Sequence, residues 1–143
     1  MNHSIAIPAD GRHAYILSAF REGRSIGENV KAQRHLIGIL AADMVTGAWD
    51  AIHYCDGAYM GEEEESVLVL CSSGDIGHIR NIRNIARMFD QDSVLRISRR
   101  GGGVLYFCDD RDPQPIGQYQ ACQPGTVEAW TRIRATGEAF TFV

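Results

Sequence analysis

The chain has 143 residues, of which 45% are hydrophobic and 22% are charged, and its formal net charge is −4. This length suits one domain over residues 1–143 that buries about two-thirds of its unfolded surface. The acidic balance argues against nonspecific DNA or RNA binding, which requires a basic face. No apolar run approaches the ~18 residues of a membrane helix, and the first residues lack a signal-peptide core. We therefore expect a cytoplasmic protein with no nucleic-acid or membrane partner.

The four cysteines are widely spaced along the chain, at Cys55, Cys71, Cys108 and Cys122. No CxxC motif and no Cys/His pair at metal-ligand spacing is present. Free cysteine is among the most buried residue types, and disulfides are rare in reducing compartments. The sequence therefore predicts buried free thiols and no metal site.

The first half of the chain predicts a strand, a helix and a hairpin. A turn-rich lead precedes a strand over residues 13–20, and a loop with two glycines follows it. Apolar residues then recur at helical spacing from Glu28 until Thr46 and Gly47. Two β-rich runs between Trp49 and Cys71 complete this half as the hairpin.

An acidic run, Glu62 to Glu65, lies between the two strands of this hairpin. We expect it in the loop, where neighbouring carboxylates repel and need either open water or a cation. A solvated acidic loop is the ordinary interpretation. Tyr54 and Tyr59 nearby favour a soft organic cation instead, because aromatic faces and carboxylates together suit such a ligand.

The second half predicts another helix and several strands. Capping residues at 72–75 precede an apolar stripe over residues 76–89, which indicates a helix packed on a core. Strands are expected at 93–98 and 104–108, joined by a glycine turn at 101–103. The remainder predicts a strand at 118–122, a short helix, and a terminal strand at 139–143.

This order predicts an α+β fold: a ferredoxin-like, PII-like β-α-β-β-α-β antiparallel sheet with both helices on one face and additional C-terminal strands. The other sheet face would stay uncovered by the chain's own helices. Such a face is often buried by oligomerisation, so we expect a homotrimer with active sites between subunits.

Several segments resemble, in matching order, the phage S-adenosylmethionine lyases, formerly called hydrolases. The resemblance spans roughly residues 13–107 and is carried by YILSAFR at 15–21, Asn29, Arg34-His35, Leu40-Ala41, Glu64-Glu65, NIAR at 84–87 and QDSVL at 91–95. It implies cleavage of S-adenosylmethionine to 5′-methylthioadenosine and homoserine lactone, without a metal or cofactor, in a trimer. In an infected bacterial host, this reaction would deplete the methyl donor and counter restriction-modification.

The resemblance also implies the site residues. Its pattern places a tyrosine late in the second strand and a glutamate entering the third, and we favour Tyr54 with Glu65 as catalytic, with Glu64 as the alternative glutamate. The expected substrate-binding residues are Ser18, Ala19, Phe20, Arg21, Asn29, His35 and Tyr59. Structural roles are open for four of these positions: sheet packing for Tyr54, a surface cation for Arg21, a helix cap for Asn29 and a partnered structural histidine for His35.

Three other functions fit the same residues. A hydrolase would use the glutamate as a base toward water and release homoserine directly. A trimeric nucleotide-binding module of the PII type would bind without turnover. A phage decoy protein would act on a host partner through its acidic loop.

Overall fold

The computed structural model describes residues 4–59, 61–72 and 76–143. In this part of the chain it contains eight strands and two helices. In chain order they are β1 (His13–Leu17), α1 (Ile26–Val45), β2 (Ala51–Tyr59), β3 (Glu62–Cys71), α2 (Ile76–Met88), β4 (Ser93–Ile97), β5 (Gly102–Phe107), β6 (Gln114–Ala121), β7 (Trp130–Ile133) and β8 (Ala139–Phe142). The capping residues expected before α2 lie partly outside the described residues.

The strands form a closed antiparallel barrel in the order β1-β3-β2-β7-β8-β6-β5-β4, with β4 also paired to β1. The predicted fold class, an open ferredoxin-like or PII-like sheet, is therefore wrong. An open sheet would leave β2 and β4 as edges with unpaired backbone groups. Instead β7 pairs with β2 and β5 pairs with β4. The strands β8 and β6 pair with each other and connect β7 to β5, which closes the barrel. The hypothesis of a PII-type module thereby loses its structural basis.

The short helix expected after residue 125 is also wrong. This region contains β7, only four residues long, which pairs with β2 from Cys55 opposite Ile133 to Ala58 opposite Trp130. Partners so far apart in sequence leave no local periodicity to read. Long-range pairing therefore decided this element.

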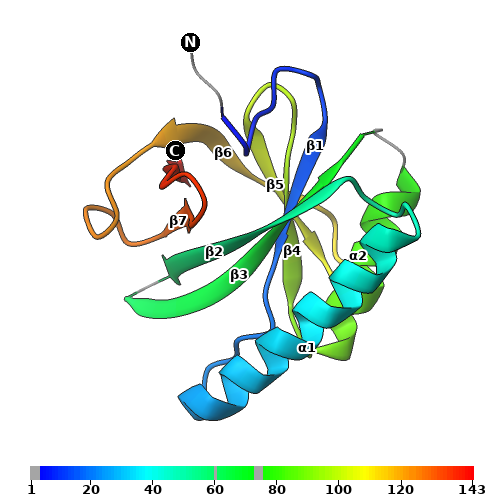
Figure 1. Cartoon of the computed structure of the whole chain (residues 1–143). Helices are drawn as coiled ribbons and strands as arrows, with labels where there is room; N and C mark the ends of the chain where they lie inside the picture. The colour runs from blue at the N-terminus through cyan, green and yellow to red at the C-terminus, as the bar shows by residue number, and fades with distance from the viewer. Residues whose placement is uncertain (1–3, 60, 73–75) are drawn as a thin grey trace.

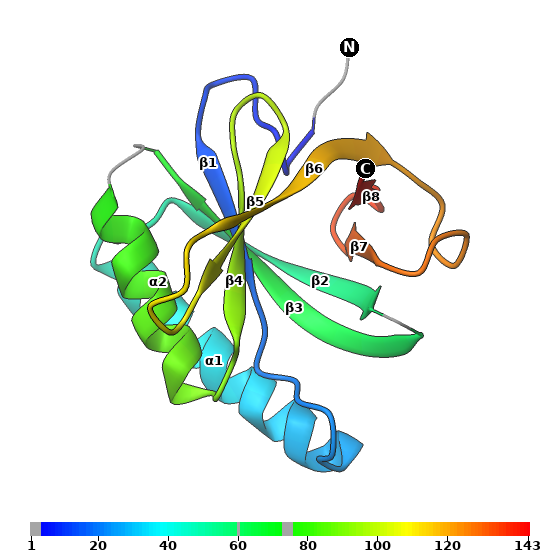
Figure 2. The same cartoon turned by 180° about the vertical axis from the view of Figure 1, so that it is seen from behind.

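Both helices pack on the outside of the barrel, on the side away from β7 and β8 (Figures 1 and 2). Ser25 caps α1: its side chain accepts a hydrogen bond from the Glu28 N–H, and the Glu28 carboxylate accepts one from the Ser25 N–H in return. The apolar side chains between helices and sheet include Tyr15, Leu17, Leu36, Leu40, Trp49, Val67, Val69 and Ile82.

A second apolar cluster fills the barrel from the other face of the same strands. Because side chains alternate along a strand, the neighbours of the helix-facing residues point inward. This inner cluster includes Ala14, Ile16, Cys55, Leu68, Leu70, Ile97, Ile133 and Phe140.

The N-terminal lead is tied to the barrel by one carboxylate. Glu138 accepts hydrogen bonds from Ser4 Oγ at 2.6 Å, the Ile5 N–H at 2.7 Å and the Tyr119 hydroxyl at 2.7 Å.

Neither of the described helices has the length and apolar character needed to cross a membrane.

Candidate functional site

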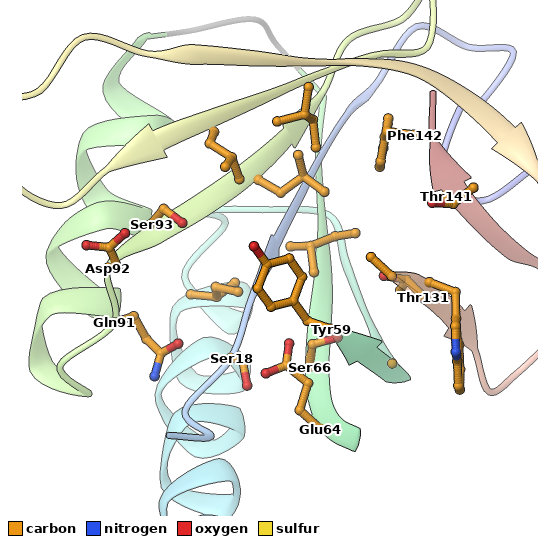
Figure 3. Close-up of a pocket in the computed structure, with 18 of the residues that line it drawn as sticks. Ser18, Tyr59, Glu64, Ser66, Gln91, Asp92, Ser93, Thr131, Thr141 and Phe142 are labelled. Carbon is orange, nitrogen blue, oxygen red and sulfur yellow. The ribbon is translucent and has the colours of Figure 1, made fainter. Parts of the chain in front are cut away.

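The barrel interior opens into a cavity of about 760 Å³ beneath the β2–β3 hairpin (Figure 3). Sites for small molecules commonly have volumes of about 300–1,000 Å³ and combine apolar walls with a few polar groups. The apolar walls here include Leu95, Leu105, Phe107, Trp130, Phe140 and Phe142, and the polar lining includes Ser18, Glu64, Ser66, Gln91, Asp92 and Thr131.

Glu64 carries the carboxylate that β3 contributes to this cavity. Strand alternation places Glu64 and Ser66 on the inner face with Leu68. Glu64 makes no ion pair or hydrogen bond through its side chain with the rest of the described chain, and burial raises the pKa of its carboxyl. A desolvated carboxylate with no partner is a strong candidate for binding a cation.

Gly57 lies directly opposite Glu64 on β2 and, like Glu64, lines the cavity. A Cβ atom at Gly57 would lie 2.8 Å from the Trp130 carbonyl oxygen of β7, closer than such contacts occur. Only glycine therefore permits the close approach of β2 and β7 at this level of the barrel.

Tyr54 and Glu65, the favoured catalytic pair, lie on the outer face of the hairpin and do not line the cavity. The Glu65 carboxylate accepts a hydrogen bond from Arg134 at 2.6 Å, and Arg134 donates to Asp56 at the same distance. Both contacts raise the pKa of the Arg134 guanidinium. Tyr54 is 47% exposed. The charge of Glu65 is thus already paired, unlike that of Glu64.

Tyr59 lines the cavity, and in Figure 3 its ring extends over Glu64 and Ser18. The expectation that Glu62 to Glu65 form a loop is wrong, because all four belong to β3. Their carboxylates alternate between the two faces of the strand, which separates neighbouring charges.

Ser18 both lines the cavity and fixes its wall. Its hydroxyl donates a hydrogen bond to the Glu65 carbonyl oxygen at 2.6 Å and accepts one from the Phe20 N–H at 3.0 Å. The hydrogen bond to the Glu65 carbonyl oxygen fixes the β3 backbone at the residue next to Glu64.

Ala19, Phe20, Arg21 and Asn29 do not line the cavity. Asn29 is buried and bonds both the N–H and the carbonyl oxygen of Arg21, while Gln33 accepts from the Ala19 N–H. The helix cap suggested for Asn29 is wrong, since Ser25 is the cap. These residues hold the segment after β1 in place.

His35 is exposed on α1 and does not line the cavity. Its ring meets Phe89 edge-on, with 5.3 Å between the ring centroids. His35 therefore packs against Phe89 at the surface of α1.

Several lining residues were not predicted as site residues, notably Gln91, Asp92 and Trp130. Arg111 closes one side of the cavity: it donates to Asp92 at 2.6 Å, and its guanidinium lies 4.0 Å from the centroid of the Phe107 ring. The only signal in the sequence was the resemblance of the segment at 91–95. Trp130 carried none, because it reaches the cavity through the pairing of β7.

The described residues contain no group of three or more His, Cys, Asp or Glu side chains that could hold a metal ion. The four cysteines are free, and Cys55 and Cys71 are buried. Burial raises the pKa of each of these two thiols to about 12, so they stay protonated at neutral pH.

Comparison with known proteins bears directly on this cavity. A search of the curated proteins found no match. The model of the S-Adenosylmethionine lyase family matches residues 15–143, from β1 to the end of β8, and so includes every residue that lines the cavity. The match confirms the resemblance to this family and continues through the C-terminal strands. The chain belongs to the S-adenosylmethionine lyase family.

Proposed function

We propose that this protein cleaves S-adenosylmethionine to 5′-methylthioadenosine and L-homoserine lactone within the barrel cavity. Family membership supports the substrate and the cleavage in general. The observation that carries the site is Glu64, an unpaired carboxylate facing an aromatic-lined cavity. Such a group suits a ligand that carries a cationic amine and a flat purine.

The reaction needs no acid, base or metal from the protein. In the substrate, a carboxylate oxygen attacks Cγ, the Cγ–S bond breaks, and its electron pair goes to sulfur, which leaves as a neutral thioether. Folding the methionyl arm so that oxygen faces Cγ makes the step unimolecular, and such positioning can supply about 7–11 kcal/mol. The protein's task is to hold this bent conformation.

We assign Glu64 to the α-ammonium group of the substrate and not to the sulfonium. A carboxylate against the sulfonium would stabilise the charged ground state more than the transition state, in which that charge disappears. The ammonium keeps its charge throughout, so binding it costs no rate. Tyr59 and the apolar wall would then surround the sulfonium and the adenosine.

Incubating the purified protein with S-adenosylmethionine should release methylthioadenosine, detectable by chromatography. Water labelled with ¹⁸O separates the lyase from the hydrolase if the lactone is trapped before it opens. The lyase leaves the lactone unlabelled, whereas hydrolysis places the label in the homoserine hydroxyl. No methylthioadenosine would refute cleavage altogether.

We further propose that the working form is a cytoplasmic homotrimer that acts in an infected bacterial host, where it depletes the methyl donor of restriction-modification systems. The outer face of the hairpin supports an assembly, since Tyr54 is 47% exposed there. A neighbouring subunit on this face would border the cavity from outside and bring Tyr54 and Glu65 into an intersubunit cleft.

Sedimentation analysis should give three times the chain mass. Tyr54→Asp should shift the protein toward smaller species, because a charge would enter the contact. Val45→Asp is the matched control: Val45 is 86% exposed at the C-terminal end of α1 and does not belong to the hairpin. A monomeric wild-type protein at micromolar concentration would contradict the trimer.

A further inference from the structure

Gln91 follows an unusual backbone corner at the end of α2. Asp90 has a φ of 55°, a left-handed conformation that non-glycine residues adopt infrequently. The corner is closed by hydrogen bonds from the Asp90 N–H to the Arg87 carbonyl oxygen and from the Gln91 N–H to that of Ala86. Arg21 Nη1 also donates to the Asp90 carbonyl oxygen at 2.9 Å.

The side-chain amide of Gln91 has a fixed orientation. Its Nε2 donates to the carbonyl oxygens of Phe20 at 3.0 Å and Phe89 at 3.3 Å, so both N–H groups are used. Exchanging the amide oxygen and nitrogen would set an oxygen against two other oxygens, which excludes the flipped form. The side-chain oxygen Oε1 must therefore point away from both carbonyls.

That oxygen is available to a ligand. Gln91 lines the cavity, and Oε1 accepts no hydrogen bond from the described part of the protein. Figure 3 shows Gln91, Ser18 and Glu64 along one side of the cavity, with the Gln91 oxygen turned toward the other two. A fixed acceptor beside an unpaired carboxylate suits a group that is cationic and carries several N–H donors.

We infer that Gln91 is a specificity-determining residue whose Oε1 accepts a hydrogen bond from the α-ammonium of the substrate, beside Glu64. This inference rests on the proposed function. An ammonium has three N–H donors, and one carboxylate leaves at least one of them unused. With two acceptors, the amine is held from two directions, which fixes the rotation of the methionyl arm.

Comparing two ligands distinguishes a contact of Gln91 with the ammonium from a contact with adenosine. S-Adenosylmethionine carries the ammonium, whereas methylthioadenosine has the same purine and ribose without it. Gln91→Met keeps the size of the side chain but removes the acceptor. It should raise the KM for S-adenosylmethionine about tenfold. Inhibition by methylthioadenosine should stay unchanged.

Gln91→Lys is a second variant, which can still donate to the two carbonyl oxygens but brings a positive charge to the amine. It should raise KM further than Gln91→Met does. Arg24→Gln is the matched control, because Arg24 pairs with Asp90 at 3.6 Å and supports the same corner without lining the cavity. It should leave KM unchanged, and thermal melting should show all three variants folded.

An equal loss of affinity for S-adenosylmethionine and for methylthioadenosine would overturn the inference. It would mean that Gln91 contacts the adenosine, or that the substitution disrupts the backbone at the end of α2. An unchanged KM in Gln91→Met would also overturn it. If the wild-type protein releases no methylthioadenosine, the proposed function fails. The role of Gln91 would then be tested by calorimetric measurement of the binding of both compounds. The variants should still lower the affinity for S-adenosylmethionine, which carries the amine, and leave that for methylthioadenosine unchanged.

Discussion

Glu64→Gln should lower kcat/KM for cleavage of S-adenosylmethionine by about 30- to 160-fold. The change removes a charge-assisted hydrogen bond worth about 2–3 kcal/mol, and each 1.36 kcal/mol is tenfold in rate. Initial rates of methylthioadenosine release measure it. Glu63→Gln is the control, because Glu63 is an exposed neighbour on the outer face of β3 and should retain full activity.

The neighbouring variant Glu65→Gln decides between the two faces of the strand. If Glu65→Gln abolishes activity while Glu64→Gln does not, the site lies on the outer face with Tyr54, and the cavity assignment is wrong. Glu65→Gln also breaks the ion pair with Arg134, so its melting temperature must be measured alongside its rate.

The same Glu64→Gln variant should be more stable to heat than the wild type at neutral pH. Burial raises the pKa of Glu64 above its ordinary 4.5, so its ionised form destabilises the fold. This destabilisation is absent below pH 4.5, where Glu64 is protonated in both the folded and the unfolded protein. It reaches its full size once the pH exceeds the raised pKa of Glu64. The stability difference should therefore vanish in acid. In the wild type, kcat/KM should fall as pH drops through this raised pKa.

Phe140→Ala should lower the free energy of unfolding by about 3–5 kcal/mol, the usual cost of emptying a buried phenylalanine site. Phe140 is fully buried, stacks on Tyr119 with 5.0 Å between ring centroids, and forms part of the cavity wall. Urea unfolding curves measure the loss.

Val143→Ala is the matched control at the end of the same segment. Val143 is 72% exposed, so its truncation should change the free energy of unfolding by less than about 0.5 kcal/mol. Similar losses in both variants would mean that β8 does not fill the barrel interior.

Local patterns account for the first six elements of the chain. Helical spacing marked α1, capping residues and an apolar stripe marked α2, and β-branched runs marked the hairpin and β4. Barrel closure could not be read in the same way, because it depends on pairing the four residues of β7 with β2, some 75 positions away. Such a short strand has too few residues for a detectable period.

The site shows the same division between local and long-range information. Alternation along β3 was visible in the sequence, where Glu64 shares a face with Ser66 and Glu65 shares one with Val67. Which face would be enclosed depended on the closure of the barrel. The choice of Glu65 rested on the family resemblance and on the face that Glu65 shares with Val67, whereas the closed barrel brings Glu64, Ser18 and Tyr59 to one cavity.

The arrangement of the strands has a consequence for synthesis in the cell. β8 joins β7 to β6, and it is the last strand of the barrel to leave the ribosome. A nascent chain can pair β1 with β3 and β4 and pack its helices early, but no enclosed ligand chamber exists at that stage. Methyl-donor consumption should therefore begin only after translation has delivered the final strand, however fast the earlier hairpins form.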